Sequence, residues 1–293
     1  IYPVTRSNRY IDGLECFASV GELPQAPDLA IIVVPAEVVA KVLEECGKRG
    51  IGAALIISSG FAEQRDEEGL RRQRALVEIA ARYSMTLCGP NAEGFLDFSS
   101  PLAATFSPTV LHGPERQVVD TGHGEPISIA SQSGGIGFSF YNRGENLGLS
   151  FSYVISTGNE ASLGLLEIVD YLIEDRNTRV VLAFLEGTRS PDQLVHVASK
   201  AAAAGKPIIA AKMGRSREAV EAAVSHTGSL TGSHQVHAAV FRHYGITLVE
   251  HSDQMLAAAA AFAHFRELLP AGKRVGILSA SGGGAIWMTD TCA

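Results

Sequence analysis

The chain has 293 residues, 46% of them hydrophobic and 19% charged, which is enough for about two domains with buried cores. Its formal net charge is −7 and no run of Lys or Arg forms a basic stripe, so we exclude a nucleic-acid partner. The four cysteines form neither a CxxC pair nor a metal-spaced Cys/His cluster, and no apolar stretch is long enough to cross a bilayer; we therefore expect no metal site, no membrane contact and a reducing, cytoplasmic location.

Residues 1–112 are predicted to form a first α/β domain. The sequence has no initiator Met and begins on an apparent strand entering a loop, so we expect a fragment whose N-terminus is truncated. Short, continuous apolar runs indicate strands buried on both faces, at 29–35, 53–58 and 85–88. Helical spacing of apolar residues predicts helices between them, at 36–49 (ended by Gly50) and 63–83. The β-α-β-α-β order with short links predicts a parallel sheet with right-handed crossovers.

Residues 97–125 are polar, rich in Pro and Gly and predicted to be irregular, with a domain boundary near residue 112. A second α/β domain is expected over 113–270. Its predicted strands are 126–131, 151–156, 179–185, 207–212 and 246–249. One predicted helix begins near 134, a second follows GNEASLG and ends near 174, and three more span 191–204, 235–244 and 252–268. Between them, 213–234 form a loop with one short helical piece at 218–223. A third α/β unit, 271–293, starts with a strand at 274–279 and stops inside a helix.

The most specific motif is SHTGSLTG at 225–232. Ser, Thr and two glycines surround His226 in a long loop after a buried strand, a composition that favours exposure and close approach to another surface. Taken alone, a loop histidine is more often an ordinary solvated side chain than a functional one.

Two further motifs, SQSGGIG at 131–137 and SASGGGA at 279–285, place glycines where a strand turns into a helix. Free N–H groups and the helix dipole at such an amino end bind an anion without Lys or Arg. A tight turn without a ligand is the alternative for either motif alone. Beside His226, the two motifs predict a phosphohistidine of about two negative charges held between two helix ends.

Glu186 follows the predicted strand 179–185, at the edge where ligand sites of open α/β sheets gather. Its carboxylate there would accept the Nδ1 proton of His226, leaving Nε2 as the nucleophile. A solvated carboxylate at a strand end is the alternative.

These motifs, together with GNEASLG and LEGTRSP, resemble the α-subunit portion of ADP-forming (nucleoside-diphosphate-forming) acyl-CoA synthetases, relatives of succinyl-CoA synthetase. VVPAEVV, IISSGF and GPNAEGF resemble the CoA-binding domain of that family, and the order of motifs matches along nearly the whole chain. The resemblance implies an α/β fold: a truncated Rossmann-like CoA-binding domain, a flavodoxin-like succinyl-CoA-synthetase-type domain and the start of another. It also implies that His226 is the phosphohistidine, that Glu186 is its partner, and that two helix ends bind phosphate through Ser131, Ser133, Gly134, Ser281, Gly282 and Gly283.

The resemblance assigns CoA contacts less directly. The positions that match the cofactor-lining loops are Val34, Pro35, Ile57, Ser58, Ser59, Gly89, Pro90 and Asn91. Arg6 and Arg9 either meet CoA phosphates or are ordinary surface residues. The glycine-rich turn that usually contacts CoA does not occur in this sequence, so the fragment is expected to bind CoA weakly or not at all and to be inactive alone. Phe138 falls where succinyl-CoA synthetase has a tyrosine near the acyl group, and its apolar ring favours a less polar acid substrate.

The implied reaction converts acyl-CoA, phosphate and ADP into a carboxylic acid, CoA and ATP through phosphorylated His226. ATP or ADP and Mg²⁺ are expected on an ATP-grasp domain, fused or on a β subunit, and the assembly is expected to be oligomeric. Two other functions remain open. One is the CoA- or acyl-CoA-sensing scaffold of a protein lysine acetyltransferase, whose relatives often lack the histidine. The other is an NAD(P)-binding oxidoreductase, which would need a GxGxxG turn and an acidic residue after the second strand.

Overall fold

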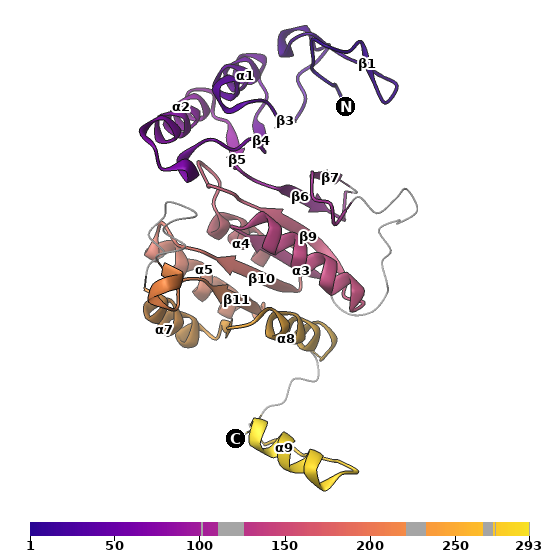
Figure 1. The fold of residues 1–293 in the computed structure, drawn as a ribbon, viewed down its shortest axis with the longest axis vertical. Coiled ribbons are helices and arrows are strands. Elements are labelled where there is room, and N and C mark those ends of the chain that lie inside the picture. Colours follow the sequence, from indigo (N-terminus) through magenta and orange to yellow (C-terminus); the bar gives the residue numbers. More distant parts are fainter. Residues whose placement is uncertain (101, 111–125, 221–232, 266–271, 273, 293) are drawn as a thin grey trace.

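A computed structural model describes residues 1–100, 102–110, 126–220, 233–265, 272 and 274–292. Two main sheets, each with a parallel core, organise this part of the chain (Figure 1). The first is three-stranded, in the order β3-β4-β5, and consists of β3 (Leu29–Ile32), β4 (Ala53–Ile56) and β5 (Thr86–Cys88). Short elements surround it: the hairpin β1 (Tyr10–Ile11) and β2 (Leu14–Glu15), and the 3₁₀ helices η1 (Val20–Glu22) and η2 (Ala62–Gln64).

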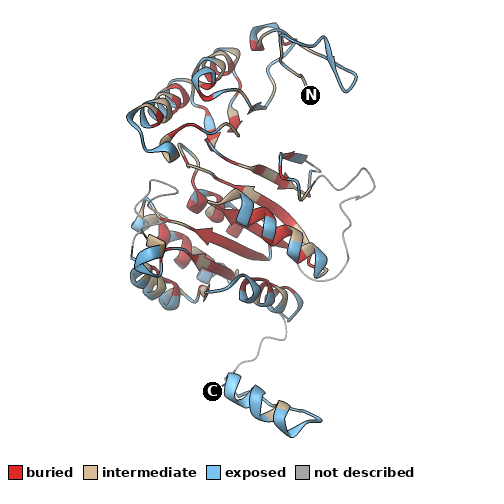
Figure 2. Cartoon of the chain, in the orientation of Figure 1, coloured by how far each residue is buried: buried red, intermediate tan, exposed pale blue. Residues whose placement is uncertain are grey.

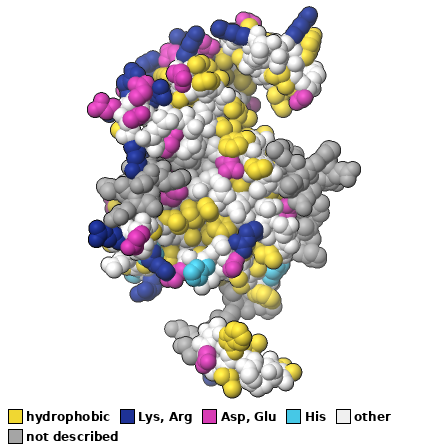
Figure 3. Space-filling model, in the orientation of Figure 1, with side chains coloured by type: hydrophobic (Ala, Val, Ile, Leu, Met, Phe, Trp, Pro, Cys, Tyr) yellow, Lys and Arg dark blue, Asp and Glu magenta, His cyan; other side chains and the backbone are white. Residues whose placement is uncertain are grey.

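Helices α1 (Ala36–Arg49) and α2 (Glu67–Tyr83) connect the three strands and pack on one another. Each helix buries an apolar stripe at helical spacing, in which Leu43 and Leu76 are fully buried. Gly50 adopts a left-handed φ of 84° and ends α1, as expected for a C-terminal glycine. The Asp66 carboxylate accepts the Gly69 N–H at 2.6 Å and starts α2. Charged side chains gather over these helices on the outside (Figure 3).

The second sheet has seven strands in the order β12-β11-β10-β8-β9-β6-β7. Its five parallel strands are β8 (Ile127–Ser131), β9 (Phe151–Ser156), β10 (Val180–Leu185), β11 (Ile208–Lys212) and β12 (Thr247–Val249). In chain order these strands lie 2-1-3-4-5, which is the flavodoxin-like arrangement. The predicted fold class is therefore confirmed.

Two antiparallel strands, β6 (Gly94–Asp97) and β7 (Leu102–Thr105), extend this sheet beyond β9. The prediction that 97–125 are irregular is wrong for β7. Its four residues, LAAT, are too few to show a strand pattern of their own, and they form a strand because β6 offers its free edge. The chain therefore enters the second sheet before residue 112, and the domain limits 1–112, 113–270 and 271–293 stay a prediction.

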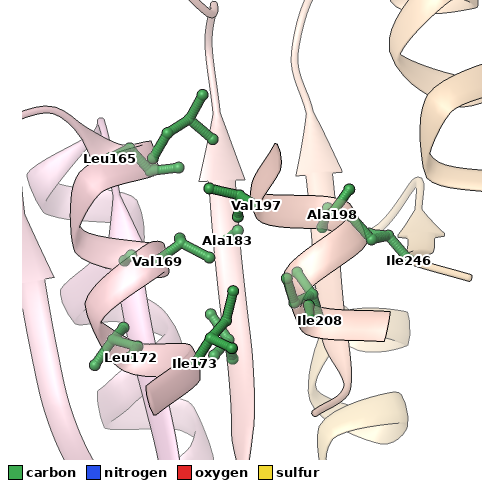
Figure 4. Packing of buried hydrophobic residues seen from close by; sticks show 14 of the residues in the cluster. Leu165, Val169, Leu172, Ile173, Ala183, Val197, Ala198, Ile208 and Ile246 are labelled. Atoms are coloured by element: carbon green, nitrogen blue, oxygen red, sulfur yellow. The ribbon is translucent and has the colours of Figure 1, made fainter. Parts of the chain in front are cut away.

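The described strands of the second sheet are followed by α3 (Gly134–Asn146), α4 (Leu165–Glu174), α5 (Pro191–Ala204), α7 (His234–Tyr244) and α8 (Ser252–Phe265). Strand β10 is buried at all six positions, and its side chains alternate between two cores. Ala183 faces the core formed with α4, α5 and α7 (Figure 4), whereas Leu182 faces the core formed with α3 and α8. Figure 2 shows this buried sheet between the two helical layers. Truncating the fully buried Leu172 to Ala is expected to cost about 2–5 kcal/mol of stability.

The C-terminal unit differs from the prediction. Residues 274–279 were expected to form a strand, but they have no regular structure, because a strand needs a hydrogen-bonded neighbour and none of the described residues supplies one. Helix α9 (Gly282–Cys292) does form, yet it buries none of its residues. Trp287 is 78% exposed, and patches of hydrophobic side chains show on the visible surface of α9 (Figure 3).

No described helix has the length and apolarity to cross a membrane. All four cysteines are free, with Cys46 buried and Cys292 exposed. Within the described ranges, no group of three or more His, Cys, Asp or Glu side chains is placed to hold a metal ion.

Candidate active site

The candidate site lies at the carboxyl ends of β8 and β10. These neighbouring strands form the switch point of the flavodoxin-like sheet, where ligand crevices of such folds occur. Ser133 and Gly134 follow β8 and begin helix α3, and Glu186 follows β10. The Gln132 side chain joins them: its Oε1 accepts the backbone N–H groups of Glu186 (2.6 Å) and Gly187 (3.0 Å), and its Nε2 donates to the Gly187 carbonyl (3.0 Å).

The amino end of α3 is open to an anion. Ser133 has extended backbone angles and no side-chain cap, so the first N–H groups of the helix keep the unpaired character typical of helix starts. Gly134 touches Glu93 so closely that a Cβ at position 134 would lie 2.4 Å from the Glu93 Cβ. A Cβ at Gly135 would meet nothing within 4 Å. Ser131 is fully buried and its hydroxyl donates to the Ser133 carbonyl, so it shapes the turn rather than facing a ligand.

Three further side chains make contacts in the loop that carries Glu186 or hold it from neighbouring elements. Lys212 is 6% exposed, and its Nζ donates to the Glu186 carbonyl at 2.9 Å. Burial lowers the pKa of Lys212 to about 8, against the opposing pull of the Glu186 charge. His237 Nε2 lies 3.0 Å from the Thr188 hydroxyl, and burial lowers the pKa of this histidine. Arg189 donates to the buried carboxylate of Glu160 at 3.3 Å.

The loop after β9 joins the two sheets. The N–H groups of Asn159, Ala161 and Leu163 donate to carbonyls of residues 87–90 at 2.8–3.0 Å, so the loop runs beside the end of β5. The Asn159 side chain also reaches α2 and η2, donating to Gln73 Oε1 at 3.1 Å and to Glu63. GNEASLG and GPNAEGF, two motifs far apart in the sequence, thus form one contact between the sheets.

The predicted CoA loops gather at the carboxyl ends of β3, β4 and β5. Because these strands are parallel neighbours, the residues that follow them meet at one edge of the sheet. The Ser58 hydroxyl donates to the Val34 carbonyl at 2.5 Å, which ties the first two loops together. Gly89 adopts a φ of 98°, and a Cβ there would lie 2.4 Å from the Ile56 carbonyl oxygen. Only glycine therefore lets the third loop lie this close to the second.

A cavity of about 790 Å³ lies between the two sheets. The sequence predicted five of the residues that line it: Ile57, Asn91, Ser133, Gly134 and Glu186. Its remaining charged lining residues are Glu63, Glu93, Glu160 and Arg189. Apolar side chains, including Leu70 and Phe106, line another part of the wall. The cavity thus combines the amino end of α3, several carboxylates and an apolar surface.

Other predicted site residues are not brought to this cavity. Phe138 is 1% exposed and packs in the core between α3 and the sheet, so the prediction that it contacts the acyl group is not supported. Ser281, Gly282 and Gly283 do begin helix α9, but they are not among the described lining residues, and α9 lies beyond α8 (Figure 1). Arg9 stacks on the Tyr10 ring at 5.5 Å, and Arg6 is exposed. His226 lies outside the described residues. The remaining predicted CoA residues lie in the loops after β3–β5 without lining the cavity: Val34, Pro35, Ser58, Ser59, Gly89 and Pro90.

Sequence reasoning assigned no role to Gln132, Glu160, Thr188, Lys212 or His237. Three of them, Gln132, Glu160 and Thr188, belong to motifs already singled out. Lys212 is a charged residue that ends an apolar strand, a position that often faces a site. His237 lies within an ordinary amphipathic helix, and its sequence carries no such signal.

Comparisons with known proteins agree with this geometry. Residues 1–96 match the family described as "CoA binding domain", and residues 124–262 match the "Succinyl-CoA ligase like flavodoxin domain". The chain is 35% identical over 290 residues to the α subunit of ADP-forming acetate–CoA ligase II from Pyrococcus furiosus, covering 99% of this chain and 60% of that subunit. It is 36% identical over 292 residues to ADP-forming acetate–CoA ligase I from Archaeoglobus fulgidus, covering all of this chain and 40% of that enzyme.

Among solved structures, the dinucleotide-forming acetyl-coenzyme A synthetase 1 of Candidatus Korarchaeum cryptofilum, in complex with phosphate and ADP, superposes with a TM-score of 0.85 at 31% identity. The match covers 99% of this chain and 59% of that one. Fold and site thus define a protein that joins a CoA-binding unit to a succinyl-CoA-ligase-type flavodoxin unit. Along nearly its whole length the chain is similar to ADP-forming acyl-CoA synthetases, as its motifs predicted. It spans 60% or less of the length of these relatives.

Proposed function

We propose that this chain is the CoA-binding and phosphoryl-carrying part of an ADP-forming acyl-CoA synthetase, an acid–thiol ligase of the acetate–CoA ligase type. The observation that carries the proposal is the shared cavity. Ile57 and Asn91 from the CoA-binding unit line the same space as the α3 amino end and Glu186 from the ligase unit. A thioester held by the first unit can therefore meet a phosphate held by the second.

In the proposed reaction, a phosphate oxygen attacks the thioester carbonyl of an acyl-CoA, and the CoA thiolate leaves. The phosphate binds at the backbone N–H groups that begin α3, next to Ser133 and Gly134, where the helix dipole offsets its charge. His226 Nε2 then attacks the phosphorus of the acyl phosphate and releases the carboxylate. Glu186 accepts the Nδ1 proton of His226 and stabilises the positive charge that develops on the ring. Synthesis of acyl-CoA is the reverse.

Strand-end loops of Rossmann-like sheets present backbone groups to cofactors, so the loops after β3, β4 and β5 suit the proposed CoA contacts. These contacts are Val34, Pro35, Ile57, Ser58, Ser59, Gly89, Pro90 and Asn91. We further propose that the phosphoryl group passes to ADP, with Mg²⁺, on an ATP-grasp domain that is fused or on a partner subunit. Since the relatives are longer than this chain, the division 1–112, 113–270 and 271–293 and an oligomeric assembly belong to the same proposal. The four free cysteines support a reducing, cytoplasmic location.

The test uses the full-length protein with acetate, CoA, ATP and Mg²⁺. The proposal predicts acetyl-CoA and ADP in equal amounts, and Glu186→Gln should slow their formation about 100-fold without changing the fold. Glu174→Gln, an exposed carboxylate at the end of α4, is the matched control and should leave the rate unchanged. AMP as the nucleotide product, or acetylation of a protein lysine instead of acyl-CoA turnover, would reject the ligase in favour of another function.

A further inference from the structure

Lys212 joins the Glu186 loop to the first residues of the segment that carries His226. Its side chain is 6% exposed, and Nζ donates both to the Glu186 carbonyl (2.9 Å) and to the Met213 carbonyl (2.5 Å). Met213 directly precedes residues 214–232, in which His226 lies. A buried ammonium group therefore bridges the main chain of the two loops.

His237 makes an equivalent connection at the other end of the same segment. Its Nδ1 lies 2.9 Å from the Ser233 carbonyl and its Nε2 lies 3.0 Å from the Thr188 hydroxyl. A carbonyl only accepts, so Nδ1 carries the proton, and Nε2 accepts the hydrogen bond that Thr188 donates. The ring is 5% exposed, and burial, opposed by the Ser233 hydrogen bond and aided by the nearby charge of Lys212, lowers its pKa, which favours the neutral form. Ser233 directly follows 221–232 in the chain.

From this arrangement, we propose that Lys212 and His237 are positioning residues that fasten the two ends of the 214–232 segment to the Glu186–Thr188 loop. The two anchors act at different points, Lys212 on the Glu186 carbonyl and His237 on the Thr188 side chain. Gln132 holds the opposite side of the same loop through the Glu186 and Gly187 N–H groups. The inference rests on the proposed function only where it concerns catalysis.

Charge explains why these residue types suit the task. A buried Lys is costly unless its donors are paired, and here two carbonyls and the Glu186 charge face it, while His237 and His234 lie on α7 nearby. Replacing Lys212 by an apolar residue leaves both carbonyls without their donor. The two loops then lose their shared contact, and the position of the Glu186 carboxylate is no longer fixed from behind.

Hydrogen–deuterium exchange on the full-length protein tests the anchors independently of any activity. Lys212→Met should raise exchange in peptides covering 186–189 and in those covering 213–216. His237→Gln should raise it in 186–189 and around 233. The matched controls are Lys200→Met, whose lysine pairs with Asp170 and Glu174, and His243→Gln, an exposed position on α7; both should leave these peptides unchanged. Exchange that rises only in the mutated element itself overturns the proposal.

Kinetics tests the positioning role. Lys212→Met and Thr188→Val should each slow phosphoryl transfer about 10- to 100-fold, the loss typical of a small misplacement of a catalytic group, while KM for CoA stays the same. Lys212→Arg and Thr188→Ser, which keep the donors, should restore most of the rate. The positioning role is overturned if Lys212→Met and Thr188→Val lose stability but keep the wild-type rate per folded molecule. It is also overturned if Lys212→Arg is no faster than Lys212→Met. If the wild-type protein forms no phosphohistidine, the proposed function fails, and the exchange experiment still decides whether the anchors exist.

Discussion

The Gln132 side-chain oxygen lies 2.6 Å from the backbone nitrogen of Glu186 and accepts its hydrogen bond. Gln132 belongs to the turn that starts helix α3, and Glu186 ends strand β10. The proposed phosphate-binding helix end and the proposed partner of the phosphohistidine are thus connected by one side chain. Their relative position is set before any ligand binds, which is what electrostatic stabilisation of a transferring phosphoryl group requires.

Removing this connection should affect both stability and catalysis. Gln132→Ala leaves two N–H groups and one carbonyl without their partner, and we expect a loss of about 1–3 kcal/mol in the free energy of unfolding. Phosphoryl transfer should slow about 10- to 100-fold because Glu186 is less well placed. Urea unfolding and single-turnover rates measure the two effects. Gln25→Leu, an exposed position, is the control, and a Gln132→Ala protein that matches it in both measurements would contradict the connection.

Two adjacent glycines at the start of α3 should respond oppositely to alanine. At Gly134 a Cβ would lie 2.4 Å from the Glu93 Cβ, so Gly134→Ala should destabilise the protein by about 1–3 kcal/mol through overpacking. At Gly135 the space is open and alanine is the better helix former, so Gly135→Ala should stabilise it by about 0.5–1 kcal/mol. Thermal and urea unfolding of the two variants measure their changes in stability. Equal effects of the two substitutions would mean that Glu93 does not approach α3 as described.

The buried Lys212 predicts a pH dependence of stability. Burial lowers its pKa in the folded protein from 10.5 to about 8. Between these pH values the unfolded chain holds a proton that the folded chain has released, so the free energy of unfolding rises with pH. The gain in unfolding free energy from Lys212 amounts to about 3 kcal/mol. It is fully present above the pKa of this lysine in the unfolded chain, and it is lost as the pH falls through about 8. The difference in unfolding free energy between the wild type and Lys212→Met should therefore shift in favour of the wild type from about pH 7 to about pH 10. A difference that does not change with pH would contradict the burial of a charged lysine.

Much of the fold was predictable because each buried strand and amphipathic helix carries its own periodic signal. Helices 36–49 and 191–204 and strand 151–156 match the predicted bounds, since Gly50, Ser190 and Gly205 mark helix ends through local backbone chemistry. The remainder depends on partners distant in the sequence. Strand β7 lacks a strong local pattern and forms on the edge of β6, and 274–279 have a strand-like sequence without a described neighbour.

The site shows the same division. Glu186, Ser133 and Gly134 could be found because strand-end carboxylates and glycine-rich helix starts follow known rules for α/β sheets. Gln132, Lys212 and His237 act through contacts with residues 26–55 positions away, and no local pattern identifies those partners. Phe138 illustrates the opposite error. A match to a family position suggested a substrate contact, whereas the apolar ring faces the core.

The most direct test of the account is the phosphorylation of His226. The full-length protein is incubated with ATP labelled at the γ-phosphate and Mg²⁺, and the labelled residue is identified by peptide mapping. The account predicts an acid-labile, base-stable phosphoprotein, labelled at His226, that transfers its label to the product when an acid and CoA are added; His226→Ala abolishes the labelling and the neighbouring His234→Ala retains it. Labelling that persists at full level in His226→Ala would contradict it.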